Sequence, residues 1–189
     1  VGSHGTHVSG TISSNPGGAR RHAGVAPGVD LFSARVFPEG ENAGATNADI
    51  ANAIDFLSRD HQCDLINMSL GAPVGSNVIE DAVQDALERG TLCICAAGNS
   101  SGPVEFPGAF SQTVAVAAAG QVGRAPTGSV SADTLPDDPS LFGRDQLYAA
   151  NFTCFGPEVD AIAPGVGIVA PVPSRHGLDS PYAAFDGTS

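Results

Sequence analysis

Continuous apolar stretches alternate with amphipathic segments along this chain. Residues 91–97 and 114–118 are almost wholly apolar, and residues 47–59 and 78–89 place apolar side chains at helical spacing. Strands that are apolar on both faces are typical of parallel sheets buried between two layers of helices. The alternation therefore predicts an α/β fold, a three-layer αβα sandwich with a mostly parallel central sheet.

Individual elements follow from the same pattern. Asn47 to Arg59 predicts one helix and Val78 to Arg89 another, which Gly90 ends, while Asp30 to Phe37 and Cys63 to Leu70 predict strands. The apolar helix positions are Ala48, Ile50, Ala51, Ile54, Leu57, Val78, Ile79, Ala82, Val83, Ala86 and Leu87. Residues 120–151 break the rhythm with scattered Pro, Gly and Asp, which predicts a surface insertion because long structureless loops are unusual inside a compact domain.

The composition fits one packed domain and excludes some partners. The chain has 189 residues, with 20 acidic side chains against 8 basic ones, all arginine, and a formal charge of -12. Such a field repels nucleic acid and anionic lipid, so neither is expected as a partner. No apolar run approaches the roughly 18 residues that a membrane span requires, and the first residues show no signal-peptide pattern.

The four cysteines predict core residues better than a metal site. Cys63, Cys93, Cys95 and Cys154 lack the paired C-x-x-C spacing of zinc sites. Cys93 and Cys95 share one face of a predicted strand, as small core residues do. A Cys63–Cys93 bridge stays open, because each of the two begins a predicted neighbouring strand.

Three widely separated segments carry chemistry, although each has a plainer interpretation. Residues 4–7 (HGTH) offer a base at the start of a helix, or else a structural turn; a metal pair is disfavoured because the H-E-x-x-H arrangement is missing. Asn99 ends a buried strand, and it can be interpreted as a turn-forming residue or as an amide that donates a hydrogen bond to an oxyanion. Ser189 follows a tight turn, and it can be interpreted as a loop residue or as a nucleophile. Asn99 and Ser69 both fall at the carboxyl ends of strands, where sites form in parallel sheets.

Together these segments resemble the subtilisin-like serine peptidases, the subtilase family, whose order along the chain is Asp, His, Asn and Ser. Further segments that are similar to family segments, in family order, are Gly24–Pro27, Asn67–Gly71, Phe155–Asp160 and Ala163–Val166. The resemblance covers residues 1–189 apart from the expected insertion at 120–151. It implies a subtilisin-like fold and a partial catalytic domain.

The resemblance also implies roles for single residues. His4 is similar to the general base, Ser189 to the nucleophile and Asn99 to the oxyanion-hole amide, whereas His7 matches a structural histidine. These roles imply a serine endopeptidase that hydrolyses peptide bonds through an acyl-enzyme intermediate, with a Ser-His-Asp triad.

Substrate-binding residues follow from the same comparison. They are Ser69, Leu70, Gly71, Ala96, Ala97, Gly98 and Gly44. The first three resemble a strand that pairs with extended substrate, and Gly44 marks the opposite wall of that groove. The next three resemble one wall of the pocket for the residue before the scissile bond, where small side chains leave a slot for a sizeable apolar residue.

Two parts of the family pattern have no counterpart in this sequence: the strand with the triad Asp, upstream of His4, and the helix that begins at Ser189. Asp30, Asp49, Asp55 and Asp64 all come after His4 in the chain, the wrong order for the triad Asp, and they are expected to be surface or helix-end carboxylates. In a serine protease, removing the function of this Asp costs about four orders of magnitude in kcat. The Asp is therefore expected outside these residues, and the segment alone is expected to show little activity.

No cofactor or metal is expected. Some subtilases hold calcium after the His helix, but Asn15 to His22 carries two arginines where oxygen ligands would be needed. Asp133, Asp137 and Asp138 are interpreted as a solvated acidic loop, with a cation site as the weaker alternative.

The expected partners are a peptide or protein substrate and a propeptide outside these residues, and the expected location is extracellular or secreted. Two alternatives stay open: a catalytically inactive subtilase-like peptide-binding module, and an acyl transferase or cyclase on the same site. An upstream sequence without the Asp would favour the first, and product masses would identify the second.

Overall fold

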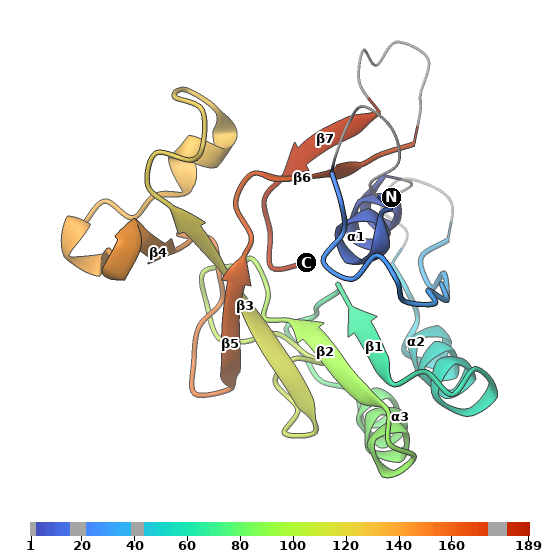
Figure 1. Ribbon diagram of the computed structural model, residues 1–189. Coiled ribbons are helices and arrows are strands. Elements are labelled where there is room, and N and C mark those ends of the chain that lie inside the picture. The colour runs from blue at the N-terminus through green and yellow to red at the C-terminus, as the bar shows by residue number, and fades with distance from the viewer. Residues whose placement is uncertain (1–2, 16–21, 39–43, 174–180) are drawn as a thin grey trace.

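A mostly parallel sheet forms the centre of the molecule. The computed structural model describes residues 3–15, 22–38, 44–173 and 181–189. The strands of the central sheet are β1 (Leu65–Met68), β2 (Leu92–Ala96), β3 (Thr113–Gln121), β4 (Leu147–Ala149) and β5 (Val159–Pro164). β2 pairs in parallel with β1 and β3, and β5 also pairs in parallel with β3, whereas β4 runs antiparallel to β3 (Figure 1). The expected α/β fold with a mostly parallel sheet is confirmed.

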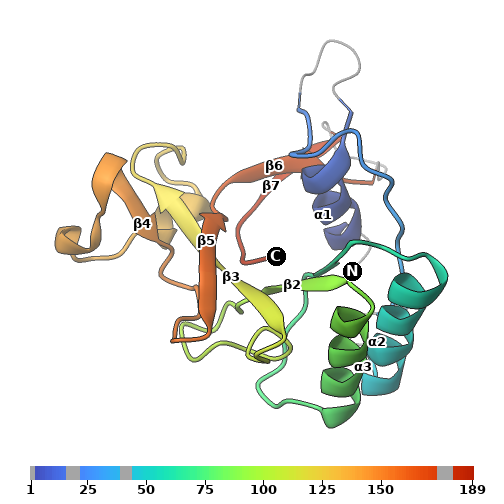
Figure 2. The same cartoon turned by 60° about the horizontal axis from the view of Figure 1, so that its bottom comes forward.

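Two helices cover one face of this sheet. They are α2 (Asn47–Asp55), which continues as a π-helical turn at Phe56–Asp60, and α3 (Asn77–Glu88). Figure 2 shows them side by side below β2. Their apolar faces pack in one buried cluster with β1 and β2, which includes Ile54 and Val83 from the helices and Cys93 and Cys95 from β2. On the opposite face of β1, Leu65 is 62% exposed.

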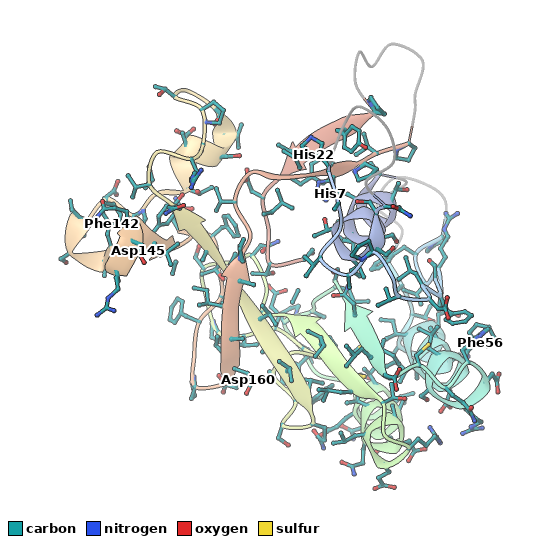
Figure 3. All side chains as sticks on the ribbon, viewed as in Figure 1. His7, His22, Phe56, Phe142, Asp145 and Asp160 are labelled. Atoms are coloured by element: carbon teal, nitrogen blue, oxygen red, sulfur yellow. The ribbon has the colours of Figure 1, made fainter. Side chains whose placement is uncertain are left out.

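A third helix, α1 (His4–Ser13), packs against a hairpin formed by β6 (Ile168–Pro171) and β7 (Tyr182–Phe185). His7 lies between them (Figure 3) and is buried. Its Nε2 donates to the carbonyl oxygens of Ile168 at 2.9 Å and Ala183 at 3.2 Å, and its ring stacks on Phe185 at 4.3 Å. The structural role expected for His7 fits these contacts.

Two glycines of α1 differ in what surrounds them. A Cβ on Gly10 would collide with the ring of Pro171 in β6, whereas one on Gly5 would meet no atom within 4 Å. Gly10 therefore allows the close approach of helix and hairpin, because only a residue without a side chain fits there.

The prediction of a strand at Asp30–Phe37 is wrong, because these residues form no strand in the structure. A strand exists only through hydrogen bonds to a neighbour. In the described part of the chain, β1 pairs with β2 alone, and no strand pairs with residues 30–37. Leu31 and Phe32 accordingly remain 43% and 47% exposed.

Residues 120–151 are not structureless. They contain the end of β3, short 3₁₀ turns at Val130–Thr134, Pro139–Leu141 and Arg144–Gln146, and β4. Tyr148 of β4 is 3% exposed, and its hydroxyl lies 3.1 Å from the Thr134 hydroxyl. The segment is thus anchored to β3, and its status as an insertion stays a prediction.

All four cysteines are free thiols, so the bridge between Cys63 and Cys93 is not formed. Cys93 and Cys95 are each 1% exposed, as expected of core residues. Burial raises the pKa of the Cys93 thiol to about 11 and that of Cys95 to about 12, which keeps both neutral and unreactive. Among the described residues, no helix has the length and apolar character that crossing a membrane requires.

The packing of α2 generates a stability prediction. Ile54 is 2% exposed in the main cluster, so Ile54→Ala should lower the free energy of unfolding by about 2–5 kcal/mol through the cavity it leaves. Asn52→Ala on the exposed side of the same helix is the control and should change it by less than about 0.5 kcal/mol. Denaturant unfolding measures both, and equal midpoints for the two variants would contradict the assigned core.

Candidate active site

An open cleft of about 400 Å³ lies where β1 and β2 end. Its lining residues are Ser69, Leu70, Gly71, Ala96, Gly98, Asn99, Ser100, Glu105, Thr188 and Ser189. Figure 1 shows the carboxyl end of the chain near the carboxyl ends of these strands. The structure therefore joins three segments that are remote in sequence, at the edge of the sheet where parallel strands form sites.

The side-chain amide of Asn99 is held in one orientation by Thr188. The Thr188 backbone N–H and hydroxyl both donate to Asn99 Oδ1, at 2.9 Å each. The same hydroxyl accepts from the Gly98 N–H at 3.1 Å. With Oδ1 engaged twice, the amide nitrogen Nδ2 keeps its two N–H donors for another acceptor. Nδ2 makes no hydrogen bond to the described residues and lies over Gly187, 3.4 Å from where a Cβ of that residue would stand.

The turn that leads to Ser189 is fixed from the β3–β5 side. The Asp186 carboxylate accepts from the Gly167 N–H at 2.7 Å and from the Ser131 hydroxyl at 2.9 Å. The Gly187 N–H donates to the Gly165 carbonyl at 2.9 Å. These bonds tie Asp186 and Gly187 to the segment after β5 and to the 3₁₀ turn at Val130–Thr134, and so hold the turn that leads to Ser189.

Ser189 is also bonded from the β1 side. The Ser69 hydroxyl donates to the Ser189 carbonyl oxygen at 3.2 Å and accepts from the Asn67 amide at 2.9 Å. The Ser189 side chain is exposed at the cleft. An exposed hydroxyl and an oriented amide donor in the same cleft are two of the groups that nucleophilic acyl transfer uses.

His4 begins α1, and Figure 2 shows the amino end of this helix facing the central sheet. Partial burial, and then the nearby His7, lower the pKa of His4. A lowered pKa keeps the imidazole neutral near neutral pH, the state in which it accepts a proton. In the described part of the chain no carboxylate hydrogen-bonds to His4, and His4 is not among the cleft-lining residues.

The expected substrate-binding residues divide into two groups. Ser69, Leu70, Gly71, Ala96 and Gly98 all line the cleft, with Asn99 and Ser189. Ala97 and Gly44 do not: Ala97 is fully buried behind the wall, and Gly44 is exposed with no neighbouring atom near its Cβ position. The structure thus brings the two walls of the expected slot together and leaves Gly44 outside it.

Sequence reasoning missed Thr188, Ser100 and Glu105. The position of Thr188 beside the candidate nucleophile was the available signal for an orienting role. Glu105 gave no such signal, because it reaches the cleft only through a contact between chain segments. Ala72 and Phe106 exchange two backbone hydrogen bonds of 2.9 Å each, which bring Glu105 against the wall that contains Gly71.

The expected surface roles of two aspartates are confirmed. Asp49 lies in the first turn of α2, where its carboxylate accepts from the capping Thr46 hydroxyl at 2.7 Å. Asp55 lies at the end of α2 and pairs with Arg59 at 3.4 Å and Arg89 at 3.3 Å.

The calcium question concerns Asn15–His22, of which residues 16–21 lie outside the described ranges. Among the residues that the structure describes, no group of three or more His, Cys, Asp or Glu side chains is placed to hold a metal ion. Asp138 instead caps a 3₁₀ turn, accepting from the Ser140 N–H at 2.8 Å, which lowers the pKa of its carboxyl.

Comparison with known proteins gives consistent results. Residues 1–189 match the model of the subtilase family, peptidase S8. The chain is 33% identical over 189 residues to the alkaline elastase YaB of Bacillus sp. (strain YaB), covering 98% of this chain and 41% of that protein. It is 32% identical over 194 residues to the major intracellular serine protease of Bacillus subtilis (strain 168), covering 98% of this chain and 50% of that protein.

Solved structures agree with the sequence relatives. The S41 psychrophilic protease superposes with a TM-score of 0.73 at 30% identity, and sphericase with a TM-score of 0.74 at 26% identity. Each match covers 98% of this chain and 58% of the other. The chain thus spans between two fifths and three fifths of these relatives. The family match over residues 1–189, together with the shared fold, shows that the chain belongs to the subtilase family of serine proteases.

Proposed function

We propose that these residues are the main part of the catalytic domain of a serine endopeptidase, with Ser189 as nucleophile, His4 as general base and Asn99 as oxyanion donor. The observation that carries the proposal is the amide of Asn99. Thr188 engages its oxygen twice, so its N–H donors remain available beside Ser189. Such a donor, oriented before substrate arrives, stabilises negative charge as it develops.

The proposed reaction has two halves. Ser189 Oγ adds to the scissile carbonyl carbon while His4 takes its proton, and the Asn99 Nδ2–H and Ser189 N–H donate to the resulting oxyanion. Collapse breaks the carbon–nitrogen bond, and His4 returns the proton to the leaving amine. Water then attacks the acyl-enzyme by the same route, with His4 again as base, and frees Ser189.

Substrate binding is proposed to use strand addition. In the described part of the chain, no backbone hydrogen bond joins Ser69, Leu70 or Gly71 to another backbone group. Their N–H and carbonyl groups are therefore available to an extended peptide, which would bind through its main chain while pockets select side chains.

The triad Asp is proposed to lie outside these residues. β1 is paired on one edge only within the described ranges, so it offers its other edge to a further strand. An Asp on such a strand would orient His4 and stabilise its cationic form. The segment alone is accordingly proposed to have little activity, and a propeptide and a secreted location stay predictions.

Covalent labelling tests the proposed nucleophile. A fluorophosphonate should label the full-length protein on Ser189, and Ser189→Ala should abolish the label while leaving the circular dichroism spectrum unchanged. A folded protein without label would favour the inactive binding module. Mass analysis of peptide products identifies the chemistry: hydrolysis adds one water per cleavage, whereas transfer or cyclisation does not.

The proposed oxyanion donor generates a kinetic prediction. Asn99→Ala should lower kcat by about 10² to 10³ with little change in KM, a magnitude known from the oxyanion-hole Asn of a subtilisin. The reason is that the amide acts on charge present only in the transition state. Steady-state kinetics on a chromogenic peptide measure the loss; a matching rise in KM would instead assign Asn99 to ground-state binding.

The orienting role of Thr188 generates another. Thr188→Val removes the hydroxyl that joins the Gly98 N–H to Asn99 Oδ1 and should lower kcat by about tenfold, the equivalent of one lost hydrogen bond. Thr188→Ser keeps the hydroxyl and should retain most of the activity. Equal losses in the two variants would show that the methyl group, and not the hydrogen bonds, matters.

A further inference from the structure

The substrate residue that would enter the cleft follows from the proposed chemistry. A scissile carbonyl placed between Ser189 Oγ and Asn99 Nδ2 belongs to the residue before the scissile bond. The side chain of that residue therefore enters the neighbouring space between Gly71, from the wall after β1, and Gly98, from the wall after β2. Whatever lies between these two walls determines which side chain is accepted.

Glu105 lies between these walls. A Cβ on Gly71 would collide with Glu105 Oε2, and a Cβ on Gly98 would stand 2.7 Å from the carboxyl carbon Cδ of Glu105. Both walls thus lack side chains where the carboxyl group lies. Gly98 has a φ of +111°, a conformation that residues with a side chain rarely adopt, so this gap is built into the backbone.

One oxygen of the carboxylate is held and the other is free. The Ser100 hydroxyl donates to Glu105 Oε1 at 2.9 Å and lies 3.2 Å from the buried Cys154 thiol. Oε2 accepts no hydrogen bond from the described residues. In the described part of the chain, every fully buried side-chain oxygen or nitrogen has a hydrogen-bond partner. Oε2 has no partner, so it is not fully buried, and it is open to the cleft that Glu105 lines.

No cation in the described part of the chain neutralises Glu105. The ion pairs found there join Asp55 to Arg59 and Arg89, and Asp85 to Arg89, all on the helical layer. A carboxylate that stays unpaired in a partly enclosed slot favours a cationic ligand, because the ligand supplies the missing charge and hydrogen bonds. The formal charge of -12 favours the approach of such a ligand.

We propose that Glu105 makes this slot select lysine or arginine in the residue before the scissile bond, an inference that rests on the proposed endopeptidase function. The small residues of the walls alone predict an apolar side chain there, and the carboxylate changes that preference. An ammonium or guanidinium group would donate to Oε2, while its aliphatic stem contacts the walls. Glu105 is thus a specificity-determining residue, and the chemistry remains that of Ser189.

Kinetics on the full-length protein test the preference. Peptides that differ only before the scissile bond, with Lys, Arg, Met or Phe, are compared by kcat/KM. Lys and Arg should exceed Met by about tenfold to a hundredfold, as expected for one hydrogen bond to a charged group. Glu105→Gln should remove most of this preference and retain cleavage after Met. Glu88→Gln is the control, because it removes the same charge at an exposed position on α3 and should leave the preference intact.

A binding measurement separates this inference from the proposed function. Ser189→Ala protein is titrated with a labelled peptide that carries Lys or Met at the tested position. The Lys peptide should bind about tenfold or more tightly, and Glu105→Gln in the same background should equalise the two. Equal binding, or labelling of Ser189 with equal kcat/KM for Lys and Met peptides, would overturn the inference while the endopeptidase stands. If Ser189 is not labelled, tighter binding of the Lys peptide still supports the cationic slot, on a binding module.

Discussion

The Thr188 hydroxyl makes the contact on which the candidate site depends. It accepts from the Gly98 N–H and donates to Asn99 Oδ1, so one group joins the end of β2 to the residue before Ser189. The second bond to Asn99, from the Thr188 backbone, prevents the amide from rotating. Together these bonds fix both the position of the candidate nucleophile and the direction of the candidate oxyanion donor.

The chain is also fixed on either side of this contact, at the hairpin that precedes Ser189 and at the helix that carries His4. The β6–β7 hairpin leads into the terminal turn, and its carbonyl groups at Ile168 and Ala183 accept from His7 of α1. The helix that presents His4 is therefore packed on the hairpin that leads to Ser189. The buried His7 ring, hydrogen-bonded to the hairpin, fixes α1 against the hairpin, and Gly10 allows the close packing of the two.

The cleft shows how the backbone can make room for a charged side chain. Glycines at 71 and 98 leave space on both sides of the Glu105 carboxyl group, and Ser100 holds one of its oxygens. A side chain on either glycine would displace the carboxylate. The two glycines therefore have two effects: they leave volume for a substrate side chain, and they make room for the carboxylate of Glu105.

The sequence by itself determined the α/β class, the two helices that cover the sheet, the buried faces of the cysteines and the chemical character of residues around His4, Asn99 and Ser189. These properties depend on local periodicity and on residue type. The tertiary structure alone decided which groups meet: Thr188 and Asn99 are 89 positions apart, and Glu105 reaches Gly71 through the bonds between Ala72 and Phe106. It also decided that residues 30–37 form no strand, because strand formation depends on a neighbour that local sequence does not encode.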